Sequence, residues 1–600
     1  MFSKVLVANR GEIAVRIVRA LEELGVASVV VYSELDRDTP HVKRAVEAYN
    51  LGEGPAAENY LNVEKILDVA ARAGAEAIHP GYGFLAENAP FAKACEDAGI
   101  VFIGPPASAI EAMGSKTKAR ELMQAAGVPI VPGTTEPVAT VADALAIAEA
   151  EIGFPVAVKA AGGGGGKGFR VALTAEELEG AFEGSSREGE KFFSDPTVYL
   201  ERYLHDPRHV EVQVLADRHG NVIHLGERDC SIQRRHQKVI EESPAPEWVV
   251  DPAMRARIGE IGVNAARAVD YVGAGTIEGL FSARADAEPE YFFLEMNTRV
   301  QVEHCVTEMT TGIDIVKEGI RAAAGEELSY AQQDVQLRGH AIECRINAED
   351  ASKNFAPAPG RIGRYKEPTG PGVRVDSGVE EGGEVSPMYD PMVAKLIVWD
   401  SDREQATARM LRALDEFEIE GLKTLIPFHQ ALLATEQWAR GETCRDLLED
   451  KKWLKTLAFP AAAAAAEQPE ELERVEQAYA VEVSGRRFDV RVVGPPFAGG
   501  AASNGSAGGA ARPAPKRSER KSSSAGGPDV LPSPLQGNMW KVLVKQGDAV
   551  EEGQLLCIIE AMKMENEITA HKAGTIVELP IAEGAPIQAG APIATIKSAE

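Results

Sequence analysis

Apolar runs and amphipathic stretches alternate through the first 450 residues, a pattern typical of strands that alternate with helices. The apolar run 5–8 leads into the turn Arg10-Gly11-Glu12, after which apolar positions recur at helical spacing as far as Leu24. A second apolar run covers residues 29–32. Strand, helix and strand in this order predict a parallel, doubly wound α/β domain at the N-terminus.

The last seventy residues contain an internal repeat. Three glycines recur with a shift of 37 positions, as the pairs Gly537 and Gly574, Gly547 and Gly584, and Gly553 and Gly590. Apolar positions recur at the same shift, as the pairs Val544 and Ile581, Val550 and Ile587, Leu556 and Ile593, and Ile559 and Ile596. Short strands between glycine turns, in two matching halves, predict a small all-β domain. Lys563 lies between the halves, where a tight turn would expose it, and this position favours a modification site.

Between these regions the pattern changes twice. Residues 475–493 alternate apolar and polar side chains around Ser484-Gly485, which predicts an isolated β hairpin. From about 495 to 534 the chain is mostly Gly, Ala, Ser and Pro, with a basic cluster at 512–521. Such a composition buries too little apolar surface to fold and indicates a linker, although the basic cluster would also suit an acidic partner. About 35 flexible residues span roughly 30–35 Å.

Composition and charge narrow the class of protein. The chain has 600 residues, 44% of them hydrophobic and 26% charged, as expected for a soluble protein of several domains. A formal net charge of −28 argues against non-specific nucleic-acid binding. No apolar run is long enough for a membrane span, and the N-terminus has no signal-peptide pattern. The six cysteines form no CxxC pair, so we expect reduced, buried thiols in a cytoplasmic protein.

A glycine run follows the apolar strand at 156–158. It reads Lys159-Ala160-Ala161 and then five glycines, 162–166, before Lys167 and Gly168. Consecutive glycines let backbone N–H groups approach phosphates, and the flanking lysines add positive charge. The run is not a Walker A sequence. It would also suit a plain linker, but its place inside a folded α/β region favours a phosphate-binding lid. No dinucleotide fingerprint follows the first strand, although the glycine-rich turn 79–84 lies where open α/β sheets bind ligands.

The segment from Glu295 to Glu303 alternates polar and apolar side chains. In an extended strand, this alternation would place Glu295, Asn297, Arg299, Gln301 and Glu303 on one face. With Glu278, these side chains offer hard oxygen ligands for Mg²⁺ bridging nucleotide phosphates. Arg299 and Glu303 would then remain for charge stabilisation and proton transfer. A solvated edge strand shows similar alternation, but more often carries Lys, Thr and Ser.

Two resemblances connect these features. The sequence Ala561-Met562-Lys563-Met564 resembles the signature of biotinyl carrier domains, in which the lysine carries biotin; lipoyl domains usually have Asp-Lys-Ala at that turn. From Lys4 to about Lys423, the chain resembles biotin carboxylase, an ATP-grasp enzyme. The motifs that carry this second resemblance are 8–14, 79–88, the glycine run, 207–211, 228–235, the segment from Glu295, and 343–350.

The resemblance to biotin carboxylase implies roles for individual residues. Contacts with ATP are implied for Lys116, Lys159, Gly165, Gly166, His209, Gln233 and His236, with Glu201, Arg202, Tyr203 and Leu204 lining the adenine site. Ligation of Mg²⁺ (or Mn²⁺) is implied for Glu278, Glu295 and Asn297. The residues expected around bicarbonate are Lys238, Arg299, Gln301, Val302 and Glu303. Tyr82 and Arg345 are expected to face biotin.

The chemistry implied by the resemblance has Glu303 as the general base for bicarbonate, which attacks the γ-phosphate of ATP. Arg299 stabilises charge on biotin, and Lys238 assists. Three positions depart from the family's usual residues. Cys305 stands in place of proline beside the expected base, Phe169 in place of methionine after the lid, and Arg202 in place of lysine. Cys305 would be the most consequential of these, because it adjoins Glu303.

The predicted architecture is a multidomain α/β protein. A doubly wound N-terminal domain (1–115), an ATP-grasp domain (116–325, lid at about 132–204) and an α+β C-terminal domain (326–450) are followed by a connecting segment with a hairpin (451–494). A flexible linker (495–530) and an all-β, lipoyl-like biotinyl sandwich (531–598) complete the chain. Ala283 to Pro289 is expected to be a hairpin loop.

The function implied by both resemblances is the α subunit of an acyl-CoA carboxylase. Because the chain ends soon after the repeat, we expect carboxyl transfer on a separate β subunit, with a biotin protein ligase as a further partner and an oligomeric complex. A two-chain pyruvate carboxylase and an inactive nucleotide-binding scaffold are the alternatives. The acyl-CoA itself is not encoded in any motif.

Overall fold

The computed structural model describes residues 1–134, 136–160, 168–193, 195–235, 237–283, 288–457, 475–483, 486–494, 529–535, 537–561, 564–587 and 590–597. In this part of the chain, every helix is too short or too polar to cross a membrane. The six cysteines are all buried and none forms a disulfide, as predicted from their scattered positions.

The N-terminal domain is a parallel sheet with strand order β3-β2-β1-β4-β5. Its strands are β1 (Lys4–Val7), β2 (Ala27–Ser33), β3 (Glu47–Gly52), β4 (Ala77–His79) and β5 (Val101–Phe102). The helices are α1 (Gly11–Glu23), α2 (Pro40–Arg44), α3 (Val63–Ala73), α4 (Ala89–Asp97) and α5 (Ala107–Gly114). Val5 and Val7 face one apolar cluster and Leu6 another, so both faces of the sheet are covered. The predicted parallel, doubly wound opening is confirmed.

A second, antiparallel sheet has eight strands in the order β13-β12-β9-β10-β11-β14-β21-β19. Five come from the first half of the chain: β9 (Arg208–Ala216), β10 (Val222–Arg234), β11 (Gln237–Ser243), β12 (Gly273–Ser282) and β13 (Glu290–Asn297). Three come from further along: β14 (His340–Asn347), β19 (Val373–Ser377) and β21 (Met392–Asp400). Because β11 pairs with β14, one sheet runs through the regions expected to be the ATP-grasp and C-terminal domains.

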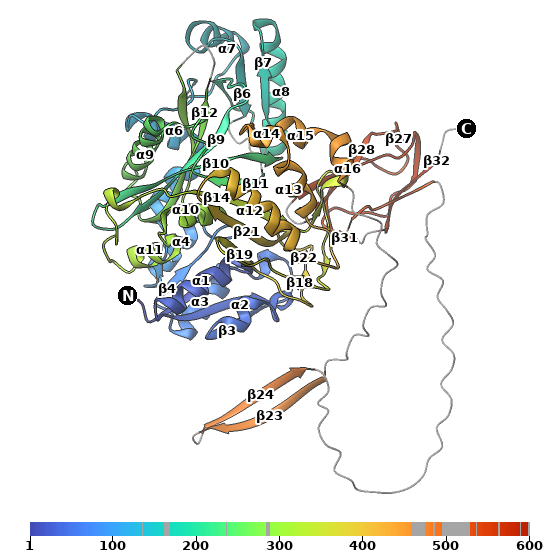
Figure 1. Ribbon diagram of the computed structural model, residues 1–600. Helices are drawn as coiled ribbons and strands as arrows, with labels where there is room; N and C mark the ends of the chain where they lie inside the picture. The colour runs from blue at the N-terminus through green and yellow to red at the C-terminus, as the bar shows by residue number, and fades with distance from the viewer. Residues whose placement is uncertain are drawn as a thin grey trace, which may run out of the picture. The chain divides into compact units, whose positions relative to one another are not determined.

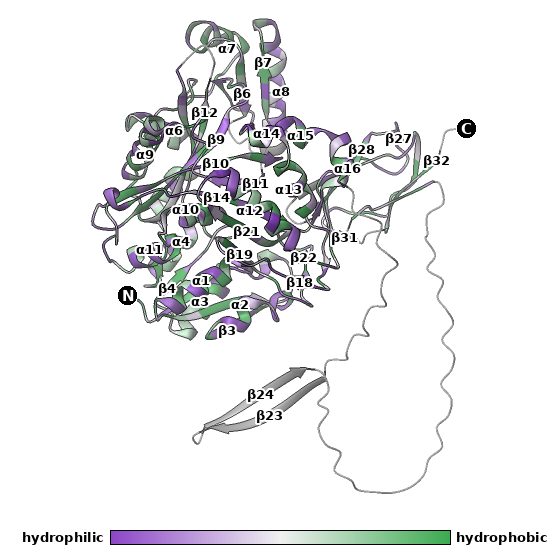
Figure 2. Ribbon diagram, in the orientation of Figure 1, coloured by the Kyte–Doolittle hydropathy of each residue, from purple (hydrophilic) through white to green (hydrophobic). Residues whose placement is uncertain are grey.

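Helices and a small sheet flank this central sheet (Figure 1). The small sheet, β7-β6-β8, consists of β6 (Val156–Ala160), β7 (Phe169–Ala172) and β8 (Val198–Arg202) and packs with α7 (Val141–Ile147) and α8 (Ala175–Phe193). The other helices are α6 (Lys116–Ala125), α9 (Pro252–Arg267), α10 (His304–Thr311), α11 (Ile315–Ala323), α12 (Arg403–Glu416), α13 (Ile426–Leu433), α14 (Glu436–Ala439), α15 (Arg445–Glu449) and α16 (Lys451–Thr456). Figure 2 shows both apolar and polar colours along α1 and α9, as expected for helices with one buried face.

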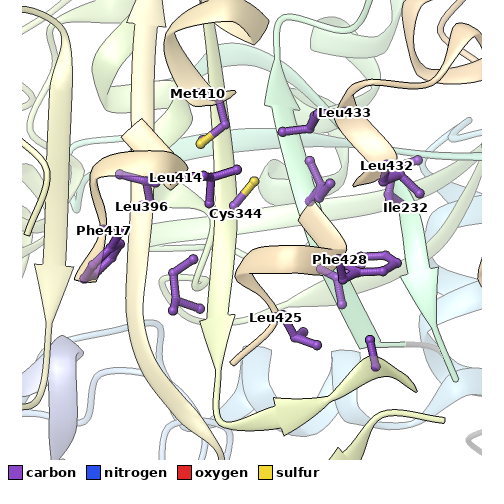
Figure 3. Close-up of a cluster of buried hydrophobic side chains, with 14 of the residues drawn as sticks. Ile232, Cys344, Leu396, Met410, Leu414, Phe417, Leu425, Phe428, Leu432 and Leu433 are labelled. Carbon is purple, nitrogen blue, oxygen red and sulfur yellow. The ribbon is translucent and has the colours of Figure 1, made fainter. Parts of the chain in front are cut away.

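The largest apolar cluster lies between the central sheet and the helices that follow it. Met410 and Leu414 from α12 meet Cys344 on β14 and Leu396 on β21, and Phe428 from α13 closes the cluster on one side (Figure 3). All five side chains are at most 1% exposed. Since β14 and β21 also carry residues on their opposite face, this core fixes the position of the charged side chains described below. Short strand pairs complete the region: β15 (Glu349–Asp350) with β16 (Ala356–Pro357), β17 (Gly360–Arg361) with β20 (Glu384–Val385), and β18 (Tyr365–Lys366) with β22 (Glu418–Ile419).

The C-terminal repeat forms two four-stranded sheets, β25-β32-β30-β27 and β29-β28-β26-β31. The strands are β25 (Val530–Pro532), β26 (Gly537–Val542), β27 (Ala549–Val550), β28 (Leu555–Ala561), β29 (Met564–Thr569), β30 (Gly574–Glu578), β31 (Pro586–Ile587) and β32 (Pro592–Lys597). Val550, Leu556 and Ile559 are buried, as are their counterparts 37 residues later. The predicted all-β sandwich is confirmed.

The glycine turns show that the two halves are structurally equivalent. Gly553 donates its N–H to the carbonyl of Ala570 at 2.9 Å, and Gly590 donates to Ser533 at 2.8 Å. Gly590 is the counterpart of Gly553, 37 residues later, and Ala570 is the counterpart of Ser533. The two hydrogen bonds therefore join the halves in opposite directions. Gly553 and Gly590 also have φ values of +84° and +82°, which glycine adopts without steric cost. The repeat therefore encodes a two-fold related pair of interlocked halves.

A separate hairpin lies before the linker. Strands β23 (Val475–Val483) and β24 (Arg486–Gly494) pair along their whole length. The hairpin predicted around Ser484-Gly485 is therefore confirmed, whereas those two turn residues lie outside the described residues. The predicted loop from Ala283 to Pro289 joins β12 to β13, and its central residues, 284–287, also lie outside the described part of the chain.

Candidate active site

A cavity of about 490 Å³ lies between the small sheet and the central sheet. Glu201, Arg202, Tyr203 and Leu204, at the end of β8 and just beyond it, contribute to its lining. Val131, Ala157, Leu280 and Leu294 add apolar surface. A largely apolar cavity beside the end of a strand suits a planar heterocycle such as adenine.

Lys159 lies in this cavity on β6 and contacts the Glu201 carboxylate. The same carboxylate accepts a hydrogen bond from Arg120 Nη1 at 2.7 Å. Glu201 is only 5% exposed, so its charge is shared by two cations in a nearly dry setting. Arg202 points elsewhere, to Glu290 Oε2 at 2.7 Å, and its guanidinium carbon lies 5.0 Å from the centre of the Phe292 ring. Phe169 also lines the cavity.

A second cavity, of about 520 Å³, meets the first at His209, Gln233 and Leu294, which line both. Its walls come from all three parts of the carboxylase region. Tyr82 and Glu12 belong to the N-terminal domain, Lys238 and Glu303 to the middle of the chain, and Arg345 to β14. A ligand spanning both cavities would therefore place one end among apolar side chains and the other among charged ones.

Lys238 lies at the centre of the second cavity, among three glutamates. Its Nζ is 2.5 Å from Glu211 Oε2, 2.8 Å from Glu278 Oε1 and 2.5 Å from Glu303 Oε1. Burial alone would lower the pKa of Lys238, but the three carboxylates raise it well above its usual value. Burial raises the pKa of Glu303, but Lys238, Arg345 and Arg228 together lower it below its usual value, so Glu303 is ionised at neutral pH.

His209 extends this cluster toward the first cavity. Its Nε2 is 2.9 Å from Glu278 Oε2. Burial opposes protonation of the ring, but Glu278 and Glu211 together raise the pKa of His209 to about 9. Glu278 in turn has its pKa lowered by Lys238 and His209 against the effect of burial. The passage between the cavities is thus lined by a cationic imidazole and an anionic carboxylate, a combination that suits phosphate and a divalent cation.

The expected magnesium ligands occupy neighbouring positions on β12 and β13. Glu278 and Glu295 are directly opposite in the antiparallel pairing, so their side chains project to the same face. Asn297 is 7% exposed, and its buried Nδ2 has no hydrogen-bond partner among the described residues. Two carboxylates and an amide oxygen on one face fit the oxygen donors that Mg²⁺ prefers.

The expectation that Glu295 to Glu303 form one extended strand is wrong. β13 ends at Asn297, and Glu303 is the residue that precedes α10. Arg299 lies in the loop between, where its Nη2 donates to Asn297 Oδ1 at 2.8 Å and its Nε to Glu87 Oε2 at 2.9 Å. The polar side chains nevertheless reach the same cavity. A loop that wraps around a cavity and a strand with one polar face produce the same alternation.

Val302 and Gln301 also lie in this loop and line the cavity. Gln301 Nε2 donates to Glu278 Oε1 at 2.6 Å. The carbonyl of Val302 accepts from Lys395 Nζ at 2.8 Å. Cys305, the departure from proline, is fully buried in the first turn of α10, with Sγ 3.1 Å from Lys395 Nζ. Lys395 therefore ties the backbone before Glu303 to the thiol after it.

Tyr82 and Arg345, the residues expected to face biotin, line the same cavity. The Tyr82 hydroxyl donates to Glu12. Arg345 Nη2 is 3.0 Å from Glu303 Oε2, and its Nε donates to Glu241 Oε1 at 2.6 Å. Arg345 is thus divided between the expected base and a second carboxylate behind it.

Several important contacts were not predictable from sequence patterns. Arg228, fully buried, donates to Glu211 Oε1 at 2.6 Å and to Gln301 Oε1 at 2.6 Å. It lies in a motif that supports the family resemblance, but its role follows only from partners far along the chain. Arg445, Leu448 and Glu449 line the first cavity from α15, and no local pattern links that helix to a nucleotide site.

Several expected site residues lie outside the described part of the chain. These are Gly165 and Gly166 of the glycine run, His236, the side chain of Lys116, and Lys563, which lies between β28 and β29. Their assigned roles stay predictions.

Family models match four segments of the chain. They are the biotin carboxylase N-terminal domain at residues 1–110, the ATP-binding domain of the carbamoyl-phosphate synthase L chain at 115–331, the biotin carboxylase C-terminal domain at 343–450, and the "biotin-requiring enzyme" biotin–lipoyl model at 528–596.

Curated relatives and solved structures agree with these matches. A pyruvate carboxylase subunit of Methanothermobacter thermautotrophicus is 54% identical over 74% of the chain and 88% of its own length. The biotin-dependent acyl-coenzyme A carboxylase alpha3 subunit of Mycobacterium leprae is 46% identical over 99% of the chain and 98% of its own length. The biotin carboxylase domain of Hydrogenobacter thermophilus 2-oxoglutarate carboxylase, solved with MgADP and bicarbonate, has a TM-score of 0.70 at 48% identity, covering 77% of this chain and 100% of that one.

Proposed function

The chain belongs to the biotin carboxylase family of ATP-dependent carbon–nitrogen ligases and carries a biotinyl domain on the same polypeptide, and from this premise we propose that it is the α subunit of a biotin-dependent acyl-CoA carboxylase. In this proposal it carboxylates biotin held on Lys563, and a separate β subunit transfers the carboxyl group to an acyl-CoA.

The observation that carries the proposal is the extent of the match to the Mycobacterium leprae alpha3 subunit. That relative aligns with 99% of this chain, including the region between the carboxylase and the biotinyl domain. The pyruvate carboxylase subunit has the higher identity over its aligned residues, 54%, but aligns with only 74% of the chain. Pyruvate or another 2-oxo acid is therefore the second candidate acceptor.

ATP, Mg²⁺ and bicarbonate are the proposed small-molecule requirements. We assign adenine to the cavity lined by 201–204, and the phosphates to the passage near Lys159 and His209. Gly165 and Gly166 of the lid, together with Lys116 and His236, would add further contacts with ATP. Glu278, Glu295 and Asn297 would hold Mg²⁺, which supplies charge neutralisation to the transferring phosphoryl group.

Glu303 is the proposed general base. Its carboxylate is ionised, lies 2.5 Å from Lys238 Nζ and faces the cavity, so Oε1 or Oε2 can accept the bicarbonate proton. Lys238, Arg299, Gln301 and the Val302 backbone would surround the anion. When bicarbonate enters, its negative charge competes for Lys238 and Arg345, and loss of these cations from Glu303 raises the basicity of Glu303 as the substrate is bound.

Biotin would occupy the side of the cavity formed by Tyr82 and Arg345, and Lys563 would carry it there. Covalently held biotin supplies the nitrogen that accepts the carboxyl group. Arg299, held at 2.8 Å from Asn297 Oδ1, offers positive charge where negative charge develops on the substrate. A carboxyltransferase β subunit, a biotin protein ligase and assembly into an oligomer complete the proposal. Six free, buried cysteines suit a cytoplasmic setting.

The direct test is ATP hydrolysis by the purified full chain in bicarbonate, with and without free biotin. We expect biotin-dependent turnover in the native protein and a loss of about 10²–10⁴-fold in the Glu303→Gln variant, which keeps the shape but not the base. Turnover that is equal in both proteins would contradict the assignment of Glu303. An exposed acid distant from the cavity, Glu96, gives the matched Glu→Gln control.

The acceptor is tested with the partner subunit co-purified from the native source. Acetyl-, propionyl- and longer acyl-CoA thioesters are compared with pyruvate and 2-oxoglutarate by incorporation of labelled bicarbonate. Incorporation into an acyl-CoA alone supports the proposal. Incorporation into pyruvate or 2-oxoglutarate alone would replace it with the second candidate.

A further inference from the structure

Two buried glutamates lie behind Arg345, on the side away from the cavity. Glu241 on β11 and Glu343 on β14 are directly opposite in the antiparallel pairing, and both are 0% exposed. Three of their four carboxylate oxygens, Glu241 Oε2 and both oxygens of Glu343, have no hydrogen-bond partner among the described residues. Two ionised carboxylates on directly opposite residues of neighbouring strands would repel strongly in a dry setting. The pair must therefore hold at least one proton.

Several charged or titratable groups face this pair from the surrounding strands and from the loop before α10. They are Arg345 on β14, Lys238 on β11, Lys395 on β21, Glu303 and the thiol of Cys230, while the thiol of Cys344 lies on the opposite face of β14. Of these groups, Arg345 makes the direct contact, with Glu241 Oε1. Lys395 contacts the Val302 carbonyl at 2.8 Å and Glu12 Oε2 at 3.2 Å, so it acts on Glu343 through its charge and not through a hydrogen bond.

The two acids differ in how readily they ionise. Burial raises the pKa of Glu241 to about 7, with Arg345 pulling it down and Glu303 pushing it up. Burial raises the pKa of Glu343 well above its usual range, because the opposing charge of Lys395 is smaller than the effect of burial and Glu241 raises the pKa further. Near neutral pH, Glu343 therefore keeps its proton while Glu241 changes state. A protonated Glu343 can supply the donor that Glu241 Oε2 lacks.

We propose that Glu241, supported by Glu343, is a positioning residue that competes with Glu303 for Arg345 while Glu241 is ionised and leaves Arg345 to Glu303 when Glu241 takes up a proton. The inference rests on the roles proposed above for Arg345 and Glu303. Neither glutamate touches substrate, because both lie behind the arginine and outside the lining of the two cavities.

Protonation of Glu241 is expected to slow the carboxylation of biotin. Once Glu241 is neutral, Glu303 is the only carboxylate in direct contact with Arg345 among the described residues. Undivided attraction to the guanidinium weakens Glu303 as a base and draws Arg345 away from the biotin side of the cavity. Carboxylation of biotin should therefore fall as pH drops through the ionisation of Glu241, near pH 7.

The test measures kcat and KM for free biotin with the full chain from pH 6 to pH 9. The native protein should lose activity below about pH 7. Glu241→Gln, fixed in the neutral state, should be about tenfold slower at pH 8.5, with a raised KM for biotin, and should lack this acid limb. The protonation of bicarbonate affects all variants equally. A loss of activity at low pH that is absent from one variant must therefore come from a group of the protein.

Substitutions of Glu343 provide an independent measurement. Glu343→Gln keeps a donor for Glu241 Oε2, and its acid limb should stay where the native one is. Glu343→Met removes the donor and should move the limb upward by about one pH unit. Glu227→Gln, which removes a buried carboxylate paired with Arg255 away from both cavities, is the control for loss of a buried acid, and its profile should match the native one.

The outcomes separate this inference from the proposed function. A native protein without biotin-dependent turnover at any pH would overturn the proposed roles of Glu303 and Arg345, and the inference with them. Native turnover with an acid limb that persists unchanged in Glu241→Gln would overturn the inference alone. If Glu241→Gln does not fold, an unmoved limb in Glu343→Met would overturn it in the same way.

Discussion

The catalytic cavity and the biotinyl domain are stabilised in opposite ways. Around the cavity, charged side chains are buried against one another: Arg228, Glu211 and Lys395 are each 0% exposed. In the biotinyl domain, the core is a set of apolar side chains such as Leu556, Ile559 and Ile596, and no charged residue is buried among its described residues. In the proposed function, the cavity holds charges in fixed positions for chemistry, whereas the biotinyl domain only presents a lysine.

This difference explains how far each region could be predicted. The biotinyl domain follows from local rules, because turns that need positive φ require glycine, and each half repeats the same spacing. Gly547 and Gly584, predicted as equivalent turns, have φ values of +97° and +78°. A repeat of 37 residues therefore specifies the strands and turns of this domain from the sequence alone.

The largest expected effect concerns that lysine. Lys563→Arg keeps the charge but removes the primary amine that an amide bond to biotin requires, so streptavidin labelling after coexpression with a biotin ligase should be lost completely. Carboxylation of free biotin should continue at the native rate, because the cavity is built by other residues. Persistent labelling would assign the modification to another lysine. Lys572→Arg, in the same domain, is the matched control.

The cavity was predictable only in part. The resemblance identified Lys238, Glu278 and Glu303, which the structure brings together around one ammonium group. It did not identify Arg228 or Glu241 as functional, because a buried charge in a strand has meaning only through its partners. For Arg228, these include Gln301 and Thr307, more than seventy residues away. Local periodicity also misjudged the segment after Asn297, since alternation cannot distinguish a strand from a loop around a cavity.

The second prediction removes one of these buried charges. Arg228→Met should destabilise the carboxylase region by about 3–5 kcal/mol, because Glu211 and Gln301 lose their partner in a dry setting. Denaturant unfolding of the full chain measures this change. Arg72→Met, where the arginine is 62% exposed and paired with Asp68, should change stability by less than about 1 kcal/mol. Equal effects of the two substitutions would mean that the buried network does not stabilise the region.

The last prediction tests the comparison directly with acid. Burial raises the pKa of Glu211, Glu278, Glu303 and Glu242, but their cationic partners lower it by more. The resulting pKa of Glu242 is about 2. A carboxyl with a lowered folded-state pKa stabilises the fold above its unfolded-state value, about 4.5, and this contribution is lost as pH falls toward the folded-state value. For Glu242 alone the loss is roughly 3 kcal/mol.

Acids with raised pKa values, such as Glu343, do not offset this loss below pH 4.5, because they are then protonated in both states. Buried histidines add to it: burial lowers the pKa of His79 and His304 to about 3, so the folded state binds fewer protons than the unfolded state below pH 6.5. The carboxylase transition in scanning calorimetry should therefore move to lower temperature as pH falls from 4.5 to 3.5, where the acids with raised pKa values no longer oppose the loss. The biotinyl transition, identified by the shift that Ile559→Ala produces through loss of about 2–5 kcal/mol of core packing, should move much less. Two transitions that shift together would show that the stability of the biotinyl domain also depends on buried charge.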